Sequence, residues 1–230
     1  MYNKTLAING SNGFLGKSIC NYLAQKYTIL KISRKDYLNP EALALILKDA
    51  DVVINLAGAR ISFFPTQSYK KEMVESRVQT TKLLVEALNL LEKKPELFIS
   101  FSAIGIYNYT GVHDESSIDF ANDFLAKLCK QWEQSAIDGN SLINNTLIAR
   151  IGLVLSRYDG MLAKMLTPFK LGFGTIIGDG TQPVSFIHLD DFLRARWRAD
   201  RSARGQMGAV RKFDLQRHQN SGAGRDFLHG

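Results

Sequence analysis

Cysteine and histidine are scarce in this sequence, and long apolar runs are missing from it. The 230 residues include two cysteines, Cys20 and Cys129, which lie far apart and form no CxxC pair. This spacing suits a reducing cytosol better than a disulfide framework. The four histidines are scattered along the chain. We therefore expect no metal site, because metal ligands recur at short, regular spacings.

No stretch of the sequence reaches the length of about 20 apolar residues that a membrane span needs. The N-terminal segment MYNKTLAING passes from one lysine directly into a strand-like segment, without the apolar core of a secretory signal. We therefore expect no contact with a membrane and a cytoplasmic location.

Acidic residues are in the minority, but the basic excess is confined to one end of the chain. The formal net charge is +7, and residues 194–230 hold nine of the 29 Lys and Arg residues but only three of the 22 Asp and Glu residues. Residues 1–193 are therefore almost neutral. Nucleic-acid-binding proteins typically carry a basic stripe on the folded surface, so this distribution argues against a nucleic-acid partner.

Apolar runs alternate with amphipathic segments over most of the chain. The expected strands are 5–10, 27–34, 51–58, 95–107 and 145–155, and the expected helices are 16–26, 39–50, 67–94 and 122–137. This order is typical of a Rossmann-type α/β fold, a doubly wound parallel sheet with helices on both faces. Ligands of such folds bind at the carboxyl ends of the strands. The length of the regular part predicts one domain over residues 1–193.

Three glycines stand between the first expected strand and its helix, in INGSNGFLGKSI. Gly10 permits a sharp turn out of the strand, Gly13 leaves room for a pyrophosphate, and Gly16 lets the helix approach the sheet. The N–H groups at the start of the helix then bind the phosphates. The alternative is a tight turn without a ligand. We predict a phosphate cradle formed by Gly10, Ser11, Asn12, Gly13, Phe14, Leu15 and Gly16.

The end of the second expected strand indicates which dinucleotide is bound. An acidic residue there would bind the ribose 2′-hydroxyl of NAD, whereas an arginine can bind the 2′-phosphate of NADP. The sequence has Ser33, Arg34 and Lys35 at this place. NADP is therefore favoured, with NAD as the other option, and ordinary surface charges are the alternative reading of Arg34 and Lys35.

Seven segments carry a resemblance to a known family. In chain order they are NGSNGFLG, INLAGARI, ESRVQTTKLL, FISFSAIGIY, FLAKLCKQWE, ARIGLVLS and FIHLDD. Over residues 4–193 the sequence resembles the extended, nucleotide-sugar-epimerase-like short-chain dehydrogenases/reductases. More narrowly, it is similar to an atypical branch labelled sugar-nucleotide epimerase or cell-division-inhibitor-like protein. The resemblance implies an NAD(P)-binding domain, a small-molecule substrate and, as in many members of the superfamily, a homodimer.

The resemblance also implies places for particular residues. Leu56, Ala57 and Gly58 of NLAG would lie beside the adenine and its ribose. The loop after Ser102 would border the nicotinamide, and Arg150 would lie where cofactor and substrate meet. These residues are therefore expected at the binding site.

The Tyr-x-x-x-Lys pair that most of the superfamily uses as its base is missing. Its two positions hold Leu125 and Cys129, while the usual Ser is retained as Ser102 and the usual Asn is replaced by Arg77. The atypical branch shares these exchanges. Without the pair, a phenolate base at neutral pH is not available at the usual place.

Three residues are the catalytic candidates, each with a structural alternative. Ser102 could donate a hydrogen bond to a substrate carbonyl, or satisfy the backbone at a strand end. Tyr107 could supply a phenol near the nicotinamide, or pack under the loop. Cys129 could act as a thiol acid or base if a cation lowered its pKa, or belong to the core.

Arg77, in the helix expected over residues 67–94, is a further candidate for the binding site. It could bind a cofactor phosphate, or a carboxylate or phosphate of the substrate. The alternative is an internal salt bridge with Glu72 or Glu75.

Two functions remain open. The first is an NADP-dependent oxidoreductase or epimerase acting on a small polar or nucleotide-linked carbonyl or alcohol. The second is a catalytically silent dinucleotide-binding sensor or regulatory protein, which the missing Tyr-x-x-x-Lys pair favours.

After Leu193 the pattern changes. Residues 194–230 show no sustained period and hold eight of the 13 arginines but one of the 16 lysines. One interpretation is a basic, Gly-rich disordered arm. The other is a change of reading frame near residue 194, which the abrupt switch in Lys and Arg usage favours. By the resemblance a small region that closes over the substrate should follow here, and we expect it to be largely missing.

Overall fold

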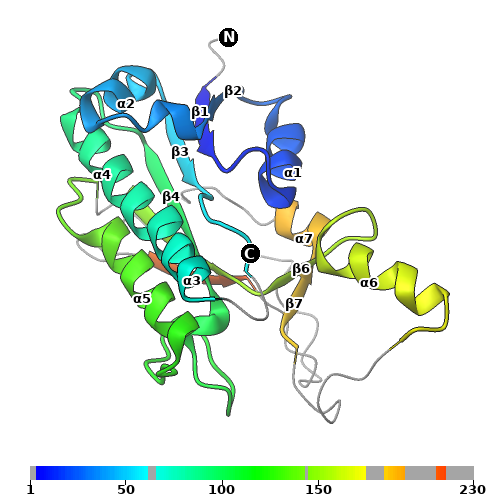
Figure 1. Cartoon of the computed structure of the whole chain (residues 1–230). Helices are drawn as coiled ribbons and strands as arrows, with labels where there is room; N and C mark the ends of the chain where they lie inside the picture. Colours follow the sequence, from blue (N-terminus) through cyan, green and yellow to red (C-terminus); the bar gives the residue numbers. More distant parts are fainter. Residues whose placement is uncertain (1–3, 62–65, 143–144, 175–183, 195–210, 216–230) are drawn as a thin grey trace. The chain divides into compact units, whose positions relative to one another are not determined.

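The computed structural model describes residues 4–61, 66–142, 145–174 and 184–194, and the backbone of residues 211–215 (Figure 1). The chain divides into two compact units. The first consists of Met1–Arg150 with Arg196–Asp214, and the second of Ile151–Ala195 with Leu215–Gly230. The division falls after Arg150, inside the stretch for which the sequence predicts one domain.

The first unit is built on a six-stranded sheet with the order β2-β1-β3-β4-β5-β8. The strands are β1 (Thr5–Asn9), β2 (Thr28–Ile32), β3 (Val52–Asn55), β4 (Leu97–Ala103), β5 (Thr146–Ile151) and β8 (Arg211–Leu215). The pairs β1/β2, β1/β3 and β3/β4 are parallel. All of β3 is buried, and β4 is buried except at its last residue, as expected for parallel strands covered on both faces.

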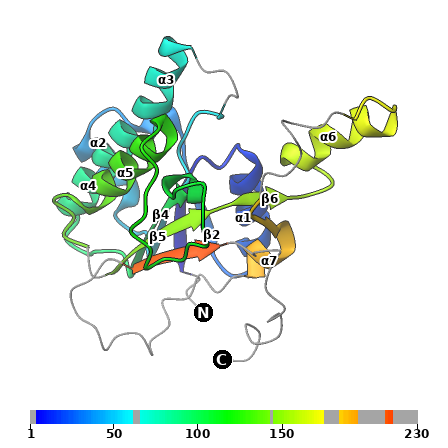
Figure 2. The same ribbon diagram turned by 90° about the horizontal axis from the view of Figure 1, so that it is seen from below.

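Helices cover both faces of this sheet. They are α1 (Phe14–Leu23), α2 (Pro40–Leu47), α3 (Gln67–Val74), α4 (Thr80–Leu90) and α5 (Phe124–Ile137). Figures 1 and 2 show α2, α4 and α5 on one face and α1 on the other. Right-handed crossovers require this distribution, because the chain reverses direction across the sheet between β2 and β3. The predicted doubly wound fold is confirmed, and the strand order reverses between β1 and β3, where such folds bind ligands.

A large apolar cluster lies between the sheet and the helices α2, α4 and α5. Its buried side chains include Val53, Phe98, Leu43, Leu84, Leu88 and Ile148. Alternate residues of each strand supply one face, and residues three or four apart supply each helix. This core fixes the strand ends that carry the candidate site.

The helix expected over residues 67–94 is interrupted. A π-helical turn, Glu75–Gln79 (η2), separates α3 from α4. A π-turn inserts an extra residue into the helical ladder and occurs frequently at functional sites. Here the insertion changes the face on which Arg77 and Val78 lie, and both are buried.

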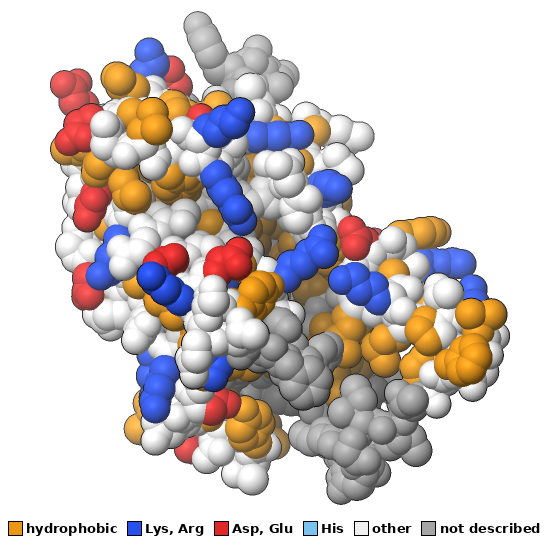
Figure 3. All heavy atoms as spheres, viewed as in Figure 1, with side chains coloured by type: hydrophobic (Ala, Val, Ile, Leu, Met, Phe, Trp, Pro, Cys, Tyr) orange, Lys and Arg blue, Asp and Glu red, His pale blue; other side chains and the backbone are white. Residues whose placement is uncertain are grey.

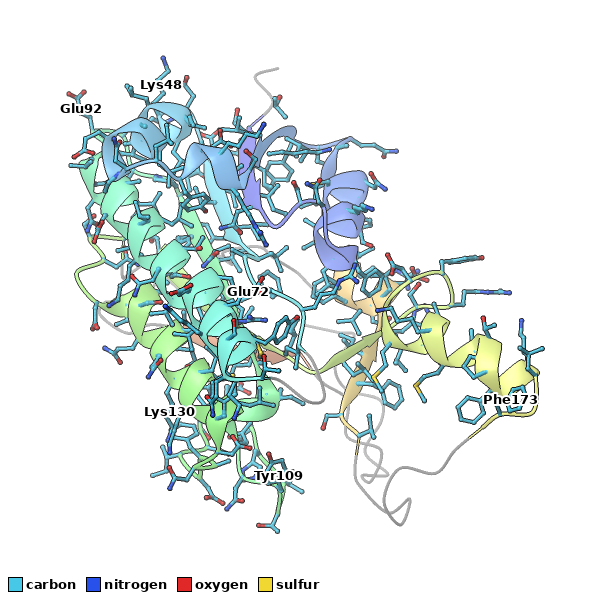
Figure 4. All side chains as sticks on the ribbon, viewed as in Figure 1. Lys48, Glu72, Glu92, Tyr109, Lys130 and Phe173 are labelled. Atoms are coloured by element: carbon cyan, nitrogen blue, oxygen red, sulfur yellow. The ribbon has the colours of Figure 1, made fainter. Side chains whose placement is uncertain are left out.

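The second unit contains a parallel pair of short strands, β6 (Leu153–Leu155) and β7 (Phe186–His188). Helix α6 (Gly160–Lys170) begins after Asp159, whose carboxylate accepts from the N–H of Gly160, and α7 (Leu189–Arg194) follows β7 directly. The strand expected over residues 145–155 is therefore divided at Gly152 into β5 and β6. In α6 no side chain is fully buried, and Phe173 lies beyond its end (Figure 4).

The strand β8 differs from the irregular structure expected for the tail. It lies at one edge of the sheet, next to β5. A sheet edge presents unpaired N–H and C=O groups that any extended segment can bind, so little side-chain pattern is needed. The remaining residues of the tail, and with them the reading-frame interpretation, lie outside the described residues.

Candidate functional site

Two glycines of the predicted phosphate cradle are required by the protein itself. Gly10 has a φ of +65°, and a Cβ there would lie 2.6 Å from the carbonyl oxygen of Leu56. A Cβ at Gly16 would lie 2.3 Å from the carbonyl oxygen of Gly10. These contacts bring β1, the loop and α1 closer together than any side chain would allow.

Gly13 is different. A Cβ there would meet only the carbonyl oxygen of Gly10, at 3.4 Å. Gly13 is also the N-cap of α1, where no side chain caps the helix and no acidic residue occupies the first turn. The helix start therefore keeps N–H groups and a positive dipole end available for an anion. Apart from its neighbours in the chain, no atom of the described residues other than the carbonyl of Gly10 lies within 4 Å of a Cβ at Gly13, and the pyrophosphate predicted there stays a prediction.

The other predicted cradle residues line this turn with different exposure. Ser11 is buried, Asn12 is exposed, and Phe14 and Leu15 are half-buried. The first two belong to the turn and the last two open α1. Side chains of these four residues differ in exposure, whereas the backbone of all four belongs to the turn or to the first turn of α1.

A buried amide network, which the sequence did not predict, holds the strand ends around this cradle. Asn9, at the end of β1, donates to Asn55 Oδ1 at 2.7 Å and to the hydroxyl of Tyr37 at 2.7 Å, and accepts from the N–H of Leu56 at 2.6 Å. Asn55 donates to the hydroxyl of Thr81 at 2.7 Å. The network fixes the spacing of β1 and β3, where the cradle faces the NLAG loop.

The strand expected over residues 51–58 ends at Asn55, so the rest of NLAG forms a loop after β3. Leu56 and Ala57 are half-buried and Gly58 is exposed. Because the carbonyl of Leu56 lies against Gly10, the loop and the cradle stand side by side at the position where the strand order reverses.

At the end of β2 the carboxylate of Asp36 is turned back onto Ser33. Asp36 accepts hydrogen bonds from the N–H of Ser33 at 2.6 Å and from its hydroxyl at 2.7 Å. Arg34 and Lys35 are exposed in the same turn, Arg34–Asp36 (η1). Ser33 thus holds the carboxylate of Asp36, while the side chains of Arg34 and Lys35 stay at the surface.

Arg77 lies in the π-turn and is only 7% exposed. Its guanidinium donates to the carbonyl of Ala59 at 2.9 Å and to that of Met73 at 3.2 Å, and lies over the ring of Trp132. Burial lowers its pKa. The alternative salt bridge is not formed: Glu75 pairs with Lys71 at 3.7 Å, and Glu72 makes no ion pair among the described residues (Figure 4).

A second buried cluster gathers around Glu133, on α5. Arg150, which is fully buried, donates to both carboxylate oxygens of Glu133, at 2.7 and 2.8 Å. The hydroxyl of Ser102 lies 2.7 Å from Glu133 Oε1. Because the carboxylate can only accept, Ser102 is the donor. Burial alone lowers the pKa of Arg150, but the hydrogen bonds and charge of Glu133 raise it.

Tyr107 completes this cluster. Its hydroxyl donates to the carbonyl of Asp114 at 2.7 Å and accepts from Arg150 at 2.6 Å. Its ring stacks on His113 and contacts Phe120. The hydroxyl of Tyr107 thus both donates and accepts a hydrogen bond within the protein, which supports the packing alternative for this residue.

Cys129 is 5% exposed and lies one helical turn before Glu133. Burial, and after it the charge of Glu133, raises its pKa to about 11. The nearby cation Arg77 does not offset these effects, so Cys129 remains a thiol at neutral pH. This favours the core alternative. The structure therefore brings Ser102, Tyr107 and Arg150 together around Glu133, a residue that the sequence did not identify as part of the site.

Other classes of site find little support in the described part of the chain. Its His, Cys, Asp and Glu side chains form no group of three that could hold a metal ion. Of its helices, none combines the length and apolar character needed to cross a membrane. Figure 3 shows Lys and Arg side chains spread over one face of the molecule, with Asp and Glu side chains among them.

Comparison with known proteins places these features in a family context. Residues 6–209 match the model of the NAD dependent epimerase/dehydratase family. An epimerase family protein of Staphylococcus epidermidis is 34% identical over 209 residues, with 83% of this chain and 69% of the relative covered. The human epimerase family protein SDR39U1 (isoform 2), solved with NADPH, superposes with a TM-score of 0.72 at 28% identity, covering 82% of this chain and 67% of that chain.

A more distant structure shares the fold alone. The UDP-glucuronic acid 4-epimerase from Bacillus cereus, in complex with UDP-glucuronic acid and NAD, superposes with a TM-score of 0.74 at 19% identity, covering 92% of this chain and 77% of that chain. Structural neighbours thus include one bound to NADPH and one bound to NAD.

Proposed function

Because the chain belongs to the NAD-dependent epimerase/dehydratase family, we propose that it binds NADP(H) and acts as an oxidoreductase or epimerase on a small polar or nucleotide-linked alcohol or carbonyl. The observation that carries the proposal is the cradle, in which Gly13 has room for a ligand and the start of α1 has no side-chain cap. Bound NADP would accept or deliver a hydride at its nicotinamide.

NADP is preferred over NAD because of the turn after β2. A 2′-phosphate carries extra negative charge, and Arg34 is exposed there to bind it while Asp36 is held by Ser33. An arginine fork suits a phosphate better than a ribose hydroxyl. The relative solved with NADPH supports this choice.

Within the site, Ser102 would contact the substrate as an acceptor. Its proton is donated to Glu133, so a ligand hydroxyl would donate to a lone pair of Ser102 that the neighbouring Cys129 does not use. This differs from the expected donation to a carbonyl and fits the alcohol form of the substrate. Arg150 maintains the arrangement, because it binds both oxygens of the carboxylate that orients Ser102.

A catalytically silent NADP(H) sensor is the second candidate. It is favoured by the saturated hydrogen bonds of Tyr107 and by the thiol state of Cys129, which together leave neither residue ready to move a proton at neutral pH. In this function the same cradle would report the state of the dinucleotide pool to a partner.

Two measurements test the proposal. A ligand at 100 times its dissociation constant stabilises a protein by about 2.7 kcal/mol, so NADP should raise the melting temperature more than an equal concentration of NAD does. Nicotinamide absorbance is then followed over a panel of alcohols, carbonyls and sugar nucleotides. No thermal shift with either dinucleotide would refute cofactor binding, and tight binding without turnover on the whole panel would select the sensor.

A further inference from the structure

The buried charge of Arg77 has no anionic partner among the described residues. A guanidinium has five N–H donors, and the contacts with the carbonyls of Ala59 and Met73 use two of them. The ring of Trp132 adds a cation–π contact, with Cζ 5.2 Å from the ring centroid. Carbonyl dipoles and an aromatic face compensate a buried cation only in part, because neither carries a full negative charge.

The neighbouring carboxylate cannot supply this charge. Both oxygens of Glu133 are bound by Arg150, and one of them also accepts from Ser102. The two buried clusters along α5 therefore contain two guanidiniums and one carboxylate. Together they carry one uncompensated positive charge, and it belongs to Arg77.

The loop after β3 is shaped to approach this charge. A Cβ at Gly58 would lie 2.8 Å from Cζ of Arg77 and 3.0 Å from one of its terminal nitrogens. Only a glycine lets the NLAG loop pass so close to the guanidinium without displacing it. The charge is thus held at the carboxyl end of β3, beside the position where the strand order reverses.

Arg77 is also coupled to the residues proposed to face the substrate. Its guanidinium lies over the ring of Trp132, the residue before Glu133 on α5, and Glu133 accepts from Ser102. The phosphates of a dinucleotide are already served by the glycine loop and the start of α1. A second, separate cation near Ser102 is therefore suited to a different anionic group.

We propose that Arg77 binds an oxyanion of the substrate, a carboxylate or a phosphate. The inference rests on the proposed function, because it assigns the oxyanion to the molecule that lies next to the cofactor. It narrows that function to anionic substrates and excludes neutral alcohols and carbonyls as the physiological ones.

The test is calorimetric titration of the full-length chain with inorganic phosphate and with acetate, at constant ionic strength, with and without saturating NADP. The wild type should bind at least one of the two oxyanions. Arg77→Met should weaken this binding by about 10- to 100-fold, the effect of losing a charged hydrogen bond. The phosphate and acetate arms distinguish the two chemical sources. Arg157→Met removes an exposed arginine and is the matched control, with binding expected unchanged.

Two further measurements separate binding from folding. The melting temperature of ligand-free Arg77→Met should equal or exceed that of the wild type, because an uncompensated buried cation is removed. Gly58→Ala keeps the arginine but crowds its guanidinium, and it should weaken the same oxyanion by about tenfold.

Three results would overturn the inference. They are a melting temperature of Arg77→Met well below that of the wild type, oxyanion binding that survives this substitution, and an effect of the substitution on NADP affinity without any oxyanion site in the NADP complex. In the last case the anion that Arg77 binds is a phosphate of NADP. If NADP binds and neither oxyanion does, this inference fails while the proposed function stands. If NADP does not bind, the proposed function fails, and the titrations without cofactor still decide the role of Arg77.

Discussion

The cradle at the end of β1 and the cluster around Glu133 are both polar, yet they use their polar groups in opposite ways. In the cradle, the start of α1 has no side-chain cap and Gly13 has open space beside it. In the cluster, the carboxylate of Glu133 is bound by Arg150 and Ser102, and Tyr107 is hydrogen-bonded on both sides. One region leaves a helix N-terminus without a side-chain cap, and the other is satisfied internally.

This difference separates what the molecule binds from how it would react. Exposed N–H groups that no side chain caps can bind water or a ligand, whereas a satisfied network stabilises the fold and orients whatever lies at its edge. The cluster therefore positions Ser102. The comparison predicts that substitutions in the cluster damage stability first, and that substitutions at Gly13 or Arg34 damage binding first.

The largest effect is expected from Arg150→Met. The substitution leaves Glu133 buried without its cation, which typically costs about 3–5 kcal/mol in the free energy of unfolding. Urea denaturation measures the loss. The double variant Arg150→Met with Glu133→Leu removes both charges and should recover most of it. A loss below about 1 kcal/mol for the single variant would mean that the pair behaves as a solvated surface pair, and the contrast between the two regions would be wrong.

Gly16→Ala should give the next largest effect. The new Cβ would lie 2.3 Å from a backbone oxygen, which cannot move without displacing α1 from the sheet. Overpacking of this kind costs about 1–3 kcal/mol. Thermal and urea unfolding should both record it, and NADP affinity should fall with it. Stability equal to that of the wild type would contradict the close approach of the loop to the helix.

Gly13→Ala sharpens the comparison inside the same loop. Its Cβ meets only one protein atom, at 3.4 Å, so stability should change by less than about 0.5 kcal/mol. NADP affinity should nevertheless fall by about tenfold, or about 1.4 kcal/mol, because the methyl group occupies the place of the pyrophosphate. The pair of variants therefore dissociates folding from binding, and a Gly13→Ala protein with normal NADP affinity would show that the phosphates lie elsewhere.

The sequence predicted the cradle because its requirements are local. Gly10, Gly13 and Gly16 lie within seven residues, and their roles follow from strand, turn and helix alone. Family comparison confirmed the epimerase resemblance and the doubly wound fold. By contrast, Ser102 is 31 residues from Glu133, and Arg150 is 17 residues from it. Which of their polar atoms meet depends on how α5 and β5 pack against β4, and no local pattern encodes that.

The roles of the catalytic candidates could not be predicted for the same reason. A serine at a strand end reads as a donor until the carboxylate that takes its proton is known. Likewise, an arginine in a helix reads as a salt-bridge partner of the nearest glutamates, but the π-turn rotates Arg77 away from that face and into the interior. Nothing in the local sequence predicts the hydrogen bond between Asn9 and Asn55, although it joins the ends of β1 and β3 beside the cradle.

The smallest effect is expected from Arg34→Ala, and it concerns cofactor choice alone. Arg34 is exposed, so its loss should leave the free energy of unfolding within about 0.5 kcal/mol of the wild type. Affinity for NADP should fall by about tenfold, while affinity for NAD stays the same, because only NADP carries the 2′-phosphate. Arg34→Lys keeps the charge but loses the forked guanidinium. Its affinity for NADP should therefore lie between those of the wild type and Arg34→Ala. Since the contact is exposed, salt should shrink the difference between NADP and NAD. Equal losses for both dinucleotides, measured by titration at low and high salt, would place Arg34 outside the 2′-phosphate contact and leave NADP preference without its structural basis.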